Sequence, residues 1–318
     1  MARGRQLKTK NNECAYPLEA AAAAFFKNNQ ARGLAIATQD IYKIYVNTFI
    51  EWCGPNVSLG DITTTHFEEF ILFKQNKGVK AVSIATHMKH LKRFFKFCIE
   101  KDYMDSIEVI IPKYEKEFKE PYTDEEMEKL LERPQSNRWT EWRNWAMINY
   151  FFSTGQRLSS VINIKINDLD LENSRVKLNW NKDKIKKYMP LSSAIVSVLK
   201  EYIKLSDLHE DDFLFPEYEG KQLKARSAED SIAKYNRSRG VYKTSIHLFR
   251  HTFAKHYIMN GGNPAKLQKL LNHKTIEMTM KYVNLYGTDV ASDLDFFNPL
   301  DRMNSNTKKT TKRRYIEN

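Results

Sequence analysis

The stretch from Ser245 to Asn284 constrains the fold of this chain more than any other, because its pattern predicts three short helices joined by tight turns. Apolar residues recur at helical intervals from 247 to about 259, which indicates the first helix. His247 and Arg250 are three residues apart and therefore share one face of this helix. Gly261 is followed by a second glycine, and the pair is expected to end the helix.

Two further helices are predicted after these glycines. Asn263 supplies an N-cap and Pro264 occupies the first helical position of the second helix, which His273 follows directly. Thr275 can cap the third helix, and Tyr282 lies near its end. The apolar residues expected to face inward from the third helix are Ile276, Met280 and Val283. The order along the chain is therefore a His/Arg pair, a tight turn, a second histidine and a tyrosine on a separate helix.

Two boxes in this stretch resemble those of the tyrosine recombinases, the phage integrase family. H-L-F-R-H-T-F-A, which begins at His247, is similar to the family's H-x-x-R box, and L-N-H followed nine residues later by Tyr282 is similar to its L-G-H…Tyr box. T-G-Q-R-L-S around Arg157 resembles the first arginine box, and Lys182 stands eight residues before a Pro-Leu pair, as the family's catalytic lysine does. The resemblance covers residues from about 120 to 297 and rests on four boxes that agree in type, order and spacing.

Three residues depart from the family pattern. Asn272 stands where glycine is usual, Ser160 stands where an acidic residue usually follows the serine, and Phe249 stands where leucine is common. None of them replaces a residue that the family uses in chemistry.

The resemblance implies a site that holds a phosphodiester. Arg157 and Arg250 would clamp the scissile phosphate, because a guanidinium is permanently charged and donates two parallel hydrogen bonds to phosphate oxygens. His247 and His273 would donate to the phosphate or exchange protons near neutral pH.

The resemblance also implies a nucleophile and an acid for the leaving group. Tyr282 would attack and form a 3′-phosphotyrosine link, with Tyr286, one turn further on, as the second choice. Lys182 would protonate the leaving 5′ oxygen, with Lys184 as the alternative. No ATP, metal or other cofactor is expected, since the acidic pairs of the chain show no metal-ligand pattern and the one at 168 and 170 is interpreted as structural.

The composition limits the class of protein. A formal net charge of +12 favours a polyanionic partner such as nucleic acid, although charge alone does not distinguish a DNA-binding protein from an ordinary basic one. Three scattered cysteines, Cys14, Cys53 and Cys98, are too few for a disulfide framework or a zinc cluster, which fits a reducing cytoplasm. The apolar run from Ala20 to Phe26 is too short for a signal peptide or a membrane span.

The hydrophobic pattern predicts a mainly α protein with a small β-hairpin or sheet (α+β). Val176, Leu178 and Trp180 alternate as in a strand, and 187–191 would return to pair with it. The predicted organisation is a basic tail at 1–16, a helical core-binding bundle at 17–105, a linker at 106–121, a catalytic domain at 122–297 and a basic tail at 298–318.

Four helices are predicted in the bundle, at 18–28, from Thr38, after a capping box formed by Thr65 and Glu68, and at about 81–101. The last of these has one apolar face and one basic face. The residues predicted to contact DNA phosphates from the basic face are Lys89, Lys92, Arg93 and Lys96, interleaved with His87 and His90. The alternative is a charged face that only contacts solvent.

The function expected from the resemblance is site-specific recombination of double-stranded DNA with inverted-repeat core sites. The enzyme would bind as a dimer at each of two sites and act as a synaptic tetramer. An accessory directionality factor is a possible further partner, and no membrane is expected. Integration, excision or transposition of a mobile element is the expected role, with resolution of replicon dimers as the alternative. Two rival hypotheses are a DNA-binding protein of this fold without strand exchange and a type IB topoisomerase-like monomer.

Overall fold

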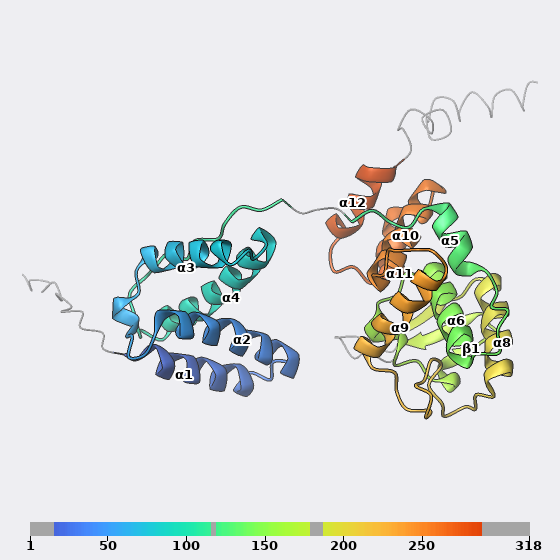
Figure 1. Ribbon diagram of the computed structural model, residues 1–318, viewed down its shortest axis with the longest axis horizontal. Helices are drawn as coiled ribbons and strands as arrows, with labels where there is room; N and C mark the ends of the chain where they lie inside the picture. The colour runs from blue at the N-terminus through green and yellow to red at the C-terminus, as the bar shows by residue number, and fades with distance from the viewer. Residues whose placement is uncertain (1–15, 116–118, 179–186, 288–318) are drawn as a thin grey trace, which may run out of the picture. The chain divides into compact units, whose positions relative to one another are not determined.

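The structure is a computed structural model that describes residues 16–115, 119–178 and 187–287. It divides into two compact units, Met1–Phe118 and Lys119–Asn318 (Figure 1). No helix in these described ranges is both long enough and apolar enough to cross a membrane.

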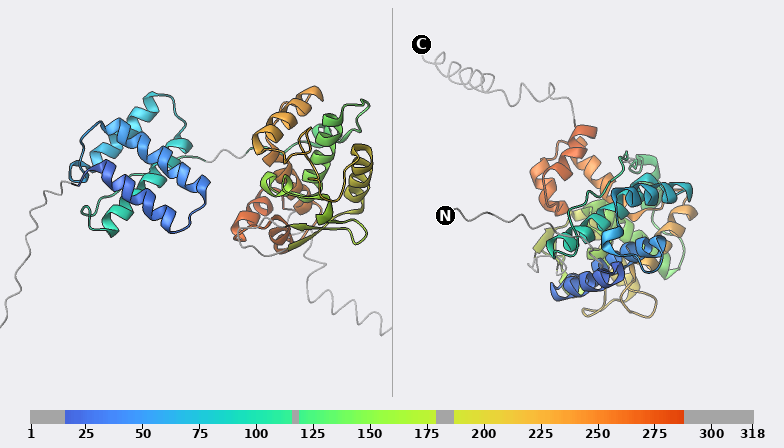
Figure 2. Two further views of the ribbon diagram at one scale, coloured as in Figure 1. Left: turned by 90° about the horizontal axis from the view of Figure 1, so that it is seen from below. Right: turned by 90° about the vertical axis from the view of Figure 1, so that its left-hand side faces the viewer.

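The first unit is a bundle of α-helices (Figure 2). Its core is rich in aromatic side chains. Its helices are α1 (Leu18–Ala31), α2 (Ile36–Cys53), α3 (Thr64–Asn76) and α4 (Ala81–Glu100), with a 3₁₀ turn at Leu59–Asp61. Phe25, Phe49, Phe67 and Phe95 are fully buried, and the ring of Phe49 meets that of Phe95 edge to face at 5.8 Å. The four predicted helices are confirmed, and the aromatic residues on their apolar faces form one core.

The start of α3 differs from the prediction. Thr63, not Thr65, is the N-cap, and its backbone N–H and hydroxyl lie 3.2 and 2.9 Å from Nδ1 of His66. Any of three successive threonines could cap this helix, and Ile62, buried in the core just before them, fixes where the chain turns into it. The predicted capping box of Thr65 and Glu68 is therefore wrong.

The second unit packs helices around a small antiparallel sheet. Its helices are α5 (Asp124–Leu131), α6 (Trp139–Thr154), α7 (Leu158–Val161), α8 (Ser193–Ser206), α9 (Ala225–Ser238), α10 (Ile246–Met259), α11 (Pro264–Leu271) and α12 (Glu277–Tyr286). Its strands are β1 (Leu169–Asp170), β2 (Arg175–Leu178) and β3 (Lys187–Pro190), in the order β1-β2-β3, with a 3₁₀ turn at Ile166–Asp168. Val176 pairs with Leu169 on one side and with Met189 on the other. The predicted fold class, mainly α with a small sheet, is confirmed.

Helix α6 is the centre of this unit, since α5, α8, α9 and α10 all pack against it. Tyr150 and Phe151 are buried on it, and the Phe151 ring lies parallel to that of Phe249 on α10 at 6.2 Å. A capping box begins α5: the Thr123 hydroxyl accepts from the Glu126 N–H at 3.2 Å, and the Thr123 N–H donates to the Glu126 carboxylate at 2.9 Å. This packing fixes the end of α6 against α10, where the predicted site residues lie.

Candidate active site

Helix α10 carries three of the polar side chains of the site on one face. His247, Arg250 and His251 follow at intervals that keep them on neighbouring positions of the helix surface. Arg250 is 3% exposed and donates from Nη1 to the Gly155 carbonyl at 2.9 Å and from Nη2 to the Leu271 carbonyl at 2.6 Å. The ends of α6 and α11 therefore hold this guanidinium in place from two sides.

Gly155 is the residue that lets α10 come this close to the end of α6. It ends α6 in the left-handed conformation at φ 59°, which a residue with a Cβ adopts at a cost. A Cβ here would lie 2.5 Å from Cδ1 of Phe253 and 2.7 Å from Cδ2 of Leu271. The T-G turn of the first arginine box thus has two physical reasons for its glycine.

Arg157 follows this turn as the N-cap of α7 and is exposed. Its Nη1 lies 3.4 Å from the Asn272 carbonyl. Asn272 ends α11 in the left-handed conformation at φ 50°, which glycine and asparagine tolerate best. The departure from glycine at this position is therefore compatible with the same turn.

His273 comes directly after this turn and is only 9% exposed. Its Nδ1 lies 2.8 Å from the Thr279 hydroxyl, and its backbone N–H donates to the Gln268 carbonyl at 3.0 Å. Burial first, and then the positive charges of Arg250 and Arg157, lower the pKa of His273 to about 4. The imidazole is therefore neutral at neutral pH.

Tyr282 lies on α12 and points into the same site, with 5% of its surface exposed. Its hydroxyl lies 2.8 Å from Nδ1 of His251, and its ring is parallel to that of His273 with the centroids 6.4 Å apart. Burial raises the pKa of the phenol, and the charge of Arg250 opposes this shift. The resting nucleophile candidate is therefore a protonated phenol beside a buried guanidinium.

The buried face of α12 differs from the prediction. Met280 is 37% exposed, whereas Thr279 and Tyr282 are buried. The helix begins at Glu277 after Ile276, so the predicted cap by Thr275 is wrong as well. The physical reason is that α12 packs its polar Thr279 against His273, and apolar contacts from α10 and α11 surround Tyr282 instead of Met280.

His247 lies at the edge of the site, with its side chain exposed. Its ring meets that of His251 at a centroid distance of 4.7 Å and an angle of 87°. Desolvation of the imidazole by the surrounding protein lowers the pKa of His247 most, and the charges of Arg250 and Arg157 lower it further. The arrangement leaves His247 able to reach a ligand that Arg157 and Arg250 would hold.

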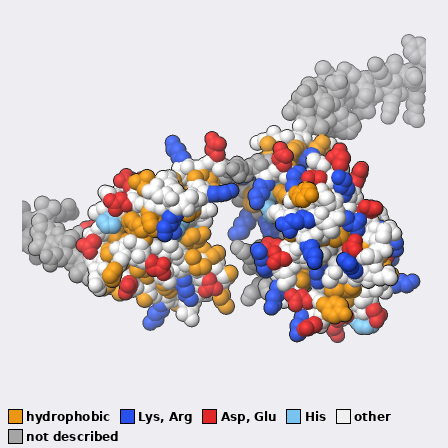
Figure 3. All heavy atoms as spheres, in the orientation of Figure 1, with side chains coloured by type: hydrophobic (Ala, Val, Ile, Leu, Met, Phe, Trp, Pro, Cys, Tyr) orange, Lys and Arg blue, Asp and Glu red, His pale blue; other side chains and the backbone are white. Residues whose placement is uncertain are grey.

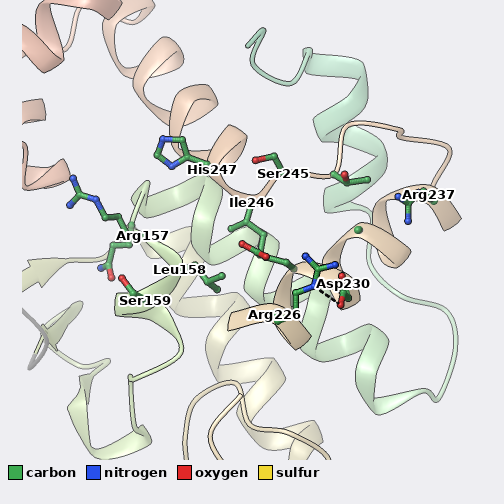
Figure 4. Close-up of a pocket in the computed structure, with 13 residues that line it drawn as sticks. Arg157, Leu158, Ser159, Arg226, Asp230, Arg237, Ser245, Ile246 and His247 are labelled. Atoms are coloured by element: carbon green, nitrogen blue, oxygen red, sulfur yellow. Dashed lines mark ion pairs between the residues drawn. The ribbon is translucent and has the colours of Figure 1, made fainter. Parts of the chain in front are cut away.

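A cavity of about 730 Å³ opens beside Arg157 and His247. Figure 4 shows these two side chains on one side of the cavity and the ion pair of Arg226 with Asp230, 3.2 Å between Nε and Oδ2, on another. Arg237 also lines it. Its charged and polar lining suits an anionic ligand better than an apolar one.

The segment that holds Lys182 and the alternative Lys184 lies outside the described residues, between the ends of β2 and β3. Tyr286 is half-buried, with Nζ of Lys255 5.8 Å from its ring centroid. The hydroxyl that contacts His251 is that of Tyr282.

His251 is the residue of the site that sequence reasoning missed, because its pattern alone is that of an ordinary helix histidine. It touches the hydroxyl of Tyr282 and the ring of His247. The signal in the sequence is its position four residues after His247, which places both on one face of α10.

The basic helix of the first unit is α4. Lys89, Lys92 and Lys96 are exposed and Arg93 is half-exposed, while Nζ of Lys89 donates to the Tyr114 hydroxyl at 3.0 Å. Lys96 lies 3.8 Å from a Glu100 carboxylate, an exposed pair that contributes little to stability.

His87 and His90 differ from these four residues. His87 is interleaved with the basic residues in the sequence, yet it is buried, with Nε2 2.7 Å from the Tyr45 carbonyl. Burial lowers its pKa to about 4, so it adds no charge to that face at neutral pH. His90 is half-buried and stacks on the ring of Tyr45.

Among the described residues, no group of three His, Cys, Asp or Glu side chains is placed to hold a metal ion. Asp168 accepts a hydrogen bond from the backbone of Lys165, and Asp170 pairs with Arg175 at 2.7 Å. This acidic pair therefore supports the turn and the sheet, as predicted.

The fold is that of a known class. Residues 121–288 match the family described as Phage integrase family, and residues 22–105 match the family described as Phage integrase, N-terminal SAM-like domain. The chain belongs to the phage integrase family and is a site-specific tyrosine recombinase.

Its relatives carry names of the same class. The chain is 25% identical over 265 residues to tyrosine recombinase XerD of Proteus mirabilis, a match that covers 80% of this chain and 84% of the relative. It is 29% identical over 238 residues to a tyrosine recombinase of Pseudothermotoga lettingae, and this match covers 72% of this chain and 80% of the relative.

Two solved structures show the same fold. A lambda integrase tetramer bound to a Holliday junction matches with a TM-score of 0.70 at 18% identity, over 91% of this chain and 83% of that one. The Tn1549 transposon integrase in complex with transposon right end DNA matches with a TM-score of 0.69 at 20% identity, over 86% of this chain and 96% of that one.

Proposed function

We propose that this recombinase cuts and rejoins DNA by attack of Tyr282 on a scissile phosphate held by Arg157 and Arg250. The observation that carries the proposal is the position of Tyr282, which is buried in a cluster with residues of α10 and α11 and whose hydroxyl contacts His251. A tyrosine with its hydroxyl beside a fixed guanidinium is arranged for nucleophilic phosphoryl transfer.

The two arginines differ in how they are held. Arg250 is fixed by two backbone carbonyls, while Arg157 is exposed and reaches toward the end of α11. We infer that Arg250 is preorganised and that Arg157 closes on the phosphate when DNA binds. Each lost donor to the transition state is worth roughly 2.7 to 4 kcal/mol by analogy with other sites of this kind.

The two histidines supply donors for the non-bridging oxygens. His273 is neutral at neutral pH, and the tautomer in which Nδ1 accepts from the Thr279 hydroxyl leaves an N–H on Nε2 to donate to the phosphate. His247, at the exposed edge, would donate a second hydrogen bond. Lys182 is proposed as the acid that protonates the leaving 5′ oxygen.

The DNA would be contacted by both units. The exposed lysines of α4, together with Arg93, are proposed to contact phosphates, and basic side chains are also spread over the visible face of the second unit (Figure 3). We propose inverted-repeat core sites, a dimer on each and a tetramer at synapsis. Support comes from the fold shared with a lambda integrase tetramer that is bound to a Holliday junction.

For the biological role, we propose integration, excision or transposition of a mobile element, with an accessory directionality factor. The fold shared with the Tn1549 transposon integrase supports this role. Resolution of replicon dimers is the second candidate, favoured by the sequence similarity to XerD of Proteus mirabilis.

The test is covalent trapping on a nicked suicide duplex, whose core site is first selected from random duplexes by binding and then footprinted. Wild type is expected to give a covalent protein–DNA band on a denaturing gel, Tyr282→Phe no band, and Tyr286→Phe, the matched control, a band. A wild type that protects the site but never forms the band would contradict strand exchange and favour the binding-protein hypothesis.

A further inference from the structure

His251 contacts the reacting atom of Tyr282 directly. Its Nδ1 lies 2.8 Å from the phenolic oxygen, and the two ring centroids are 5.7 Å apart. A contact of this length is a hydrogen bond, and it involves the hydroxyl that must lose a proton when it attacks phosphorus.

The groups around His251 decide which partner holds the proton at rest. His247 and Arg250 face it from α10, Lys119 from the segment before α5, and His273 and Tyr282 from the α11–α12 region. Burial first, and then the charges of His247, Arg250 and Lys119, lower its pKa to about 4. The imidazole is therefore neutral at neutral pH. In the tautomer with its proton on Nε2, the Nδ1 lone pair accepts from the Tyr282 O–H.

We propose that His251 is the catalytic base that takes the phenolic proton of Tyr282. This inference rests on the proposed function. In the cleavage step the Tyr282 oxygen forms a bond to phosphorus, the bond from phosphorus to the 5′ oxygen breaks, and the phenolic proton moves to Nδ1 of His251. The leaving 5′ oxygen takes its proton from the acid proposed above, Lys182. In rejoining, a 5′ hydroxyl attacks phosphorus and gives its proton to Lys182, the bond from phosphorus to the tyrosine oxygen breaks, and His251 returns its proton to that oxygen.

The charge of the substrate makes this transfer feasible. An unprotonated imidazole with a low pKa is a weak base, and the low value arises partly from the cationic groups around it. A phosphodiester anion bound between Arg157 and Arg250 would offset that positive charge, which raises the basicity of His251 when DNA is in place. The base is thereby weak at rest and stronger in the complex.

A purely positioning role is the alternative that the experiment must separate. A hydrogen bond that only orients Tyr282 would be kept by His251→Asn, whose Oδ1 can replace Nδ1 as an acceptor but cannot take up a proton at neutral pH. The base role would be lost in the same variant.

The experiment measures single-turnover cleavage from pH 5 to 9 on suicide duplexes with either an ordinary 5′ oxygen or a 5′-bridging sulfur at the scissile bond. A thiolate leaves without a proton, so the sulfur substrate removes the need for the leaving-group acid and isolates activation of the nucleophile. The variants are His251→Asn, Tyr282→Phe and the matched control His256→Asn, which changes a histidine of the same helix outside the site.

The expected result is a fall of about 10²- to 10⁴-fold for His251→Asn on both duplexes at neutral pH, with unchanged DNA affinity. Its rate should rise with pH toward that of wild type, because hydroxide replaces the base. His256→Asn should match wild type. A second measurement, on His251→Ala, should show partial recovery of the rate with added imidazole.

Cleavage by His251→Asn within threefold of wild type, or a fall that is equal at all pH values without imidazole rescue of His251→Ala, would overturn the inference alone. Absence of the covalent band in wild type would remove the proposed function and this inference together, so the two failures are distinguishable.

Discussion

Replacement of Gly155 by alanine tests whether the end of α6 fixes the buried arginine. The left-handed conformation at this residue costs an alanine about 1 to 2 kcal/mol. The new Cβ would also lie 2.5 Å from Phe253 and 2.7 Å from Leu271, and overpacking of this kind costs about 1 to 3 kcal/mol. We therefore expect Gly155→Ala to lower the free energy of unfolding by about 2 to 5 kcal/mol.

Gly240→Ala is the matched control, because Gly240 has φ 73° and a Cβ added there would meet no atom within 4 Å, so only the conformational cost applies. Urea unfolding followed by tryptophan fluorescence suits the comparison, since Trp139, Trp142 and Trp145 all lie on α6. The midpoint and slope of each curve give the free energy of unfolding of each variant under identical conditions.

The same substitution should also affect cleavage. Gly155 and Leu271 supply the two carbonyls that hold Arg250, and the clash falls between these residues. We expect slower cleavage by Gly155→Ala at temperatures where it remains folded, with Gly240→Ala close to wild type. Equal destabilisation by the two substitutions would refute the close-approach reasoning.

Three further predictions concern a turn, a buried histidine and the DNA-binding face. Asn272→Ala should destabilise by about 1 to 2 kcal/mol in urea unfolding, because φ is 50° there, and Asn272→Gly should not; equal effects would contradict the conformational argument. The pKa of His87 is lowered to about 4 from an ordinary 6.5, so the unfolded state binds more protons between these values and stability falls as pH drops from 6.5 to 4. The urea midpoint of His87→Gln should fall less than that of wild type between pH 6.5 and pH 4. An equal fall in the two proteins would argue against this linkage. Alanine at the four basic residues of α4 should reduce the slope of log affinity against log salt by about 0.9 for each lost phosphate contact. An unchanged slope would mean that the basic face of α4 contacts solvent and not DNA.

Local patterns predicted much of this structure. The cap by Asn263 formed as predicted, because the asparagine side chain accepts from the N–H groups of Ala265 and Lys266 within one turn. The spacing of the boxes singled out Arg157, Arg250, His273 and Tyr282, and the structure brings these side chains to one place. Such features depend on residues close in sequence or on a pattern shared with a family.

What the sequence could not provide depends on tertiary contacts. Met280 is apolar, as Ile276 and Val283 are, yet α12 turns Thr279 inward because His273 offers it a hydrogen-bond partner from another segment. His87 alternates with lysines on α4 but is buried against the Tyr45 carbonyl of α2. The contact of His251 with the Tyr282 hydroxyl joins residues 31 positions apart and has no local signature.

The most direct test of the account is to identify the residue that becomes linked to DNA. The covalent complex from a suicide duplex would be digested with protease and nuclease, and the peptide that carries the residual nucleotide sequenced by mass spectrometry. The account predicts that the 3′ phosphate of the residual nucleotide is esterified to the phenolic oxygen of Tyr282. A nucleotide on Tyr286, or on any serine of the site, would contradict it.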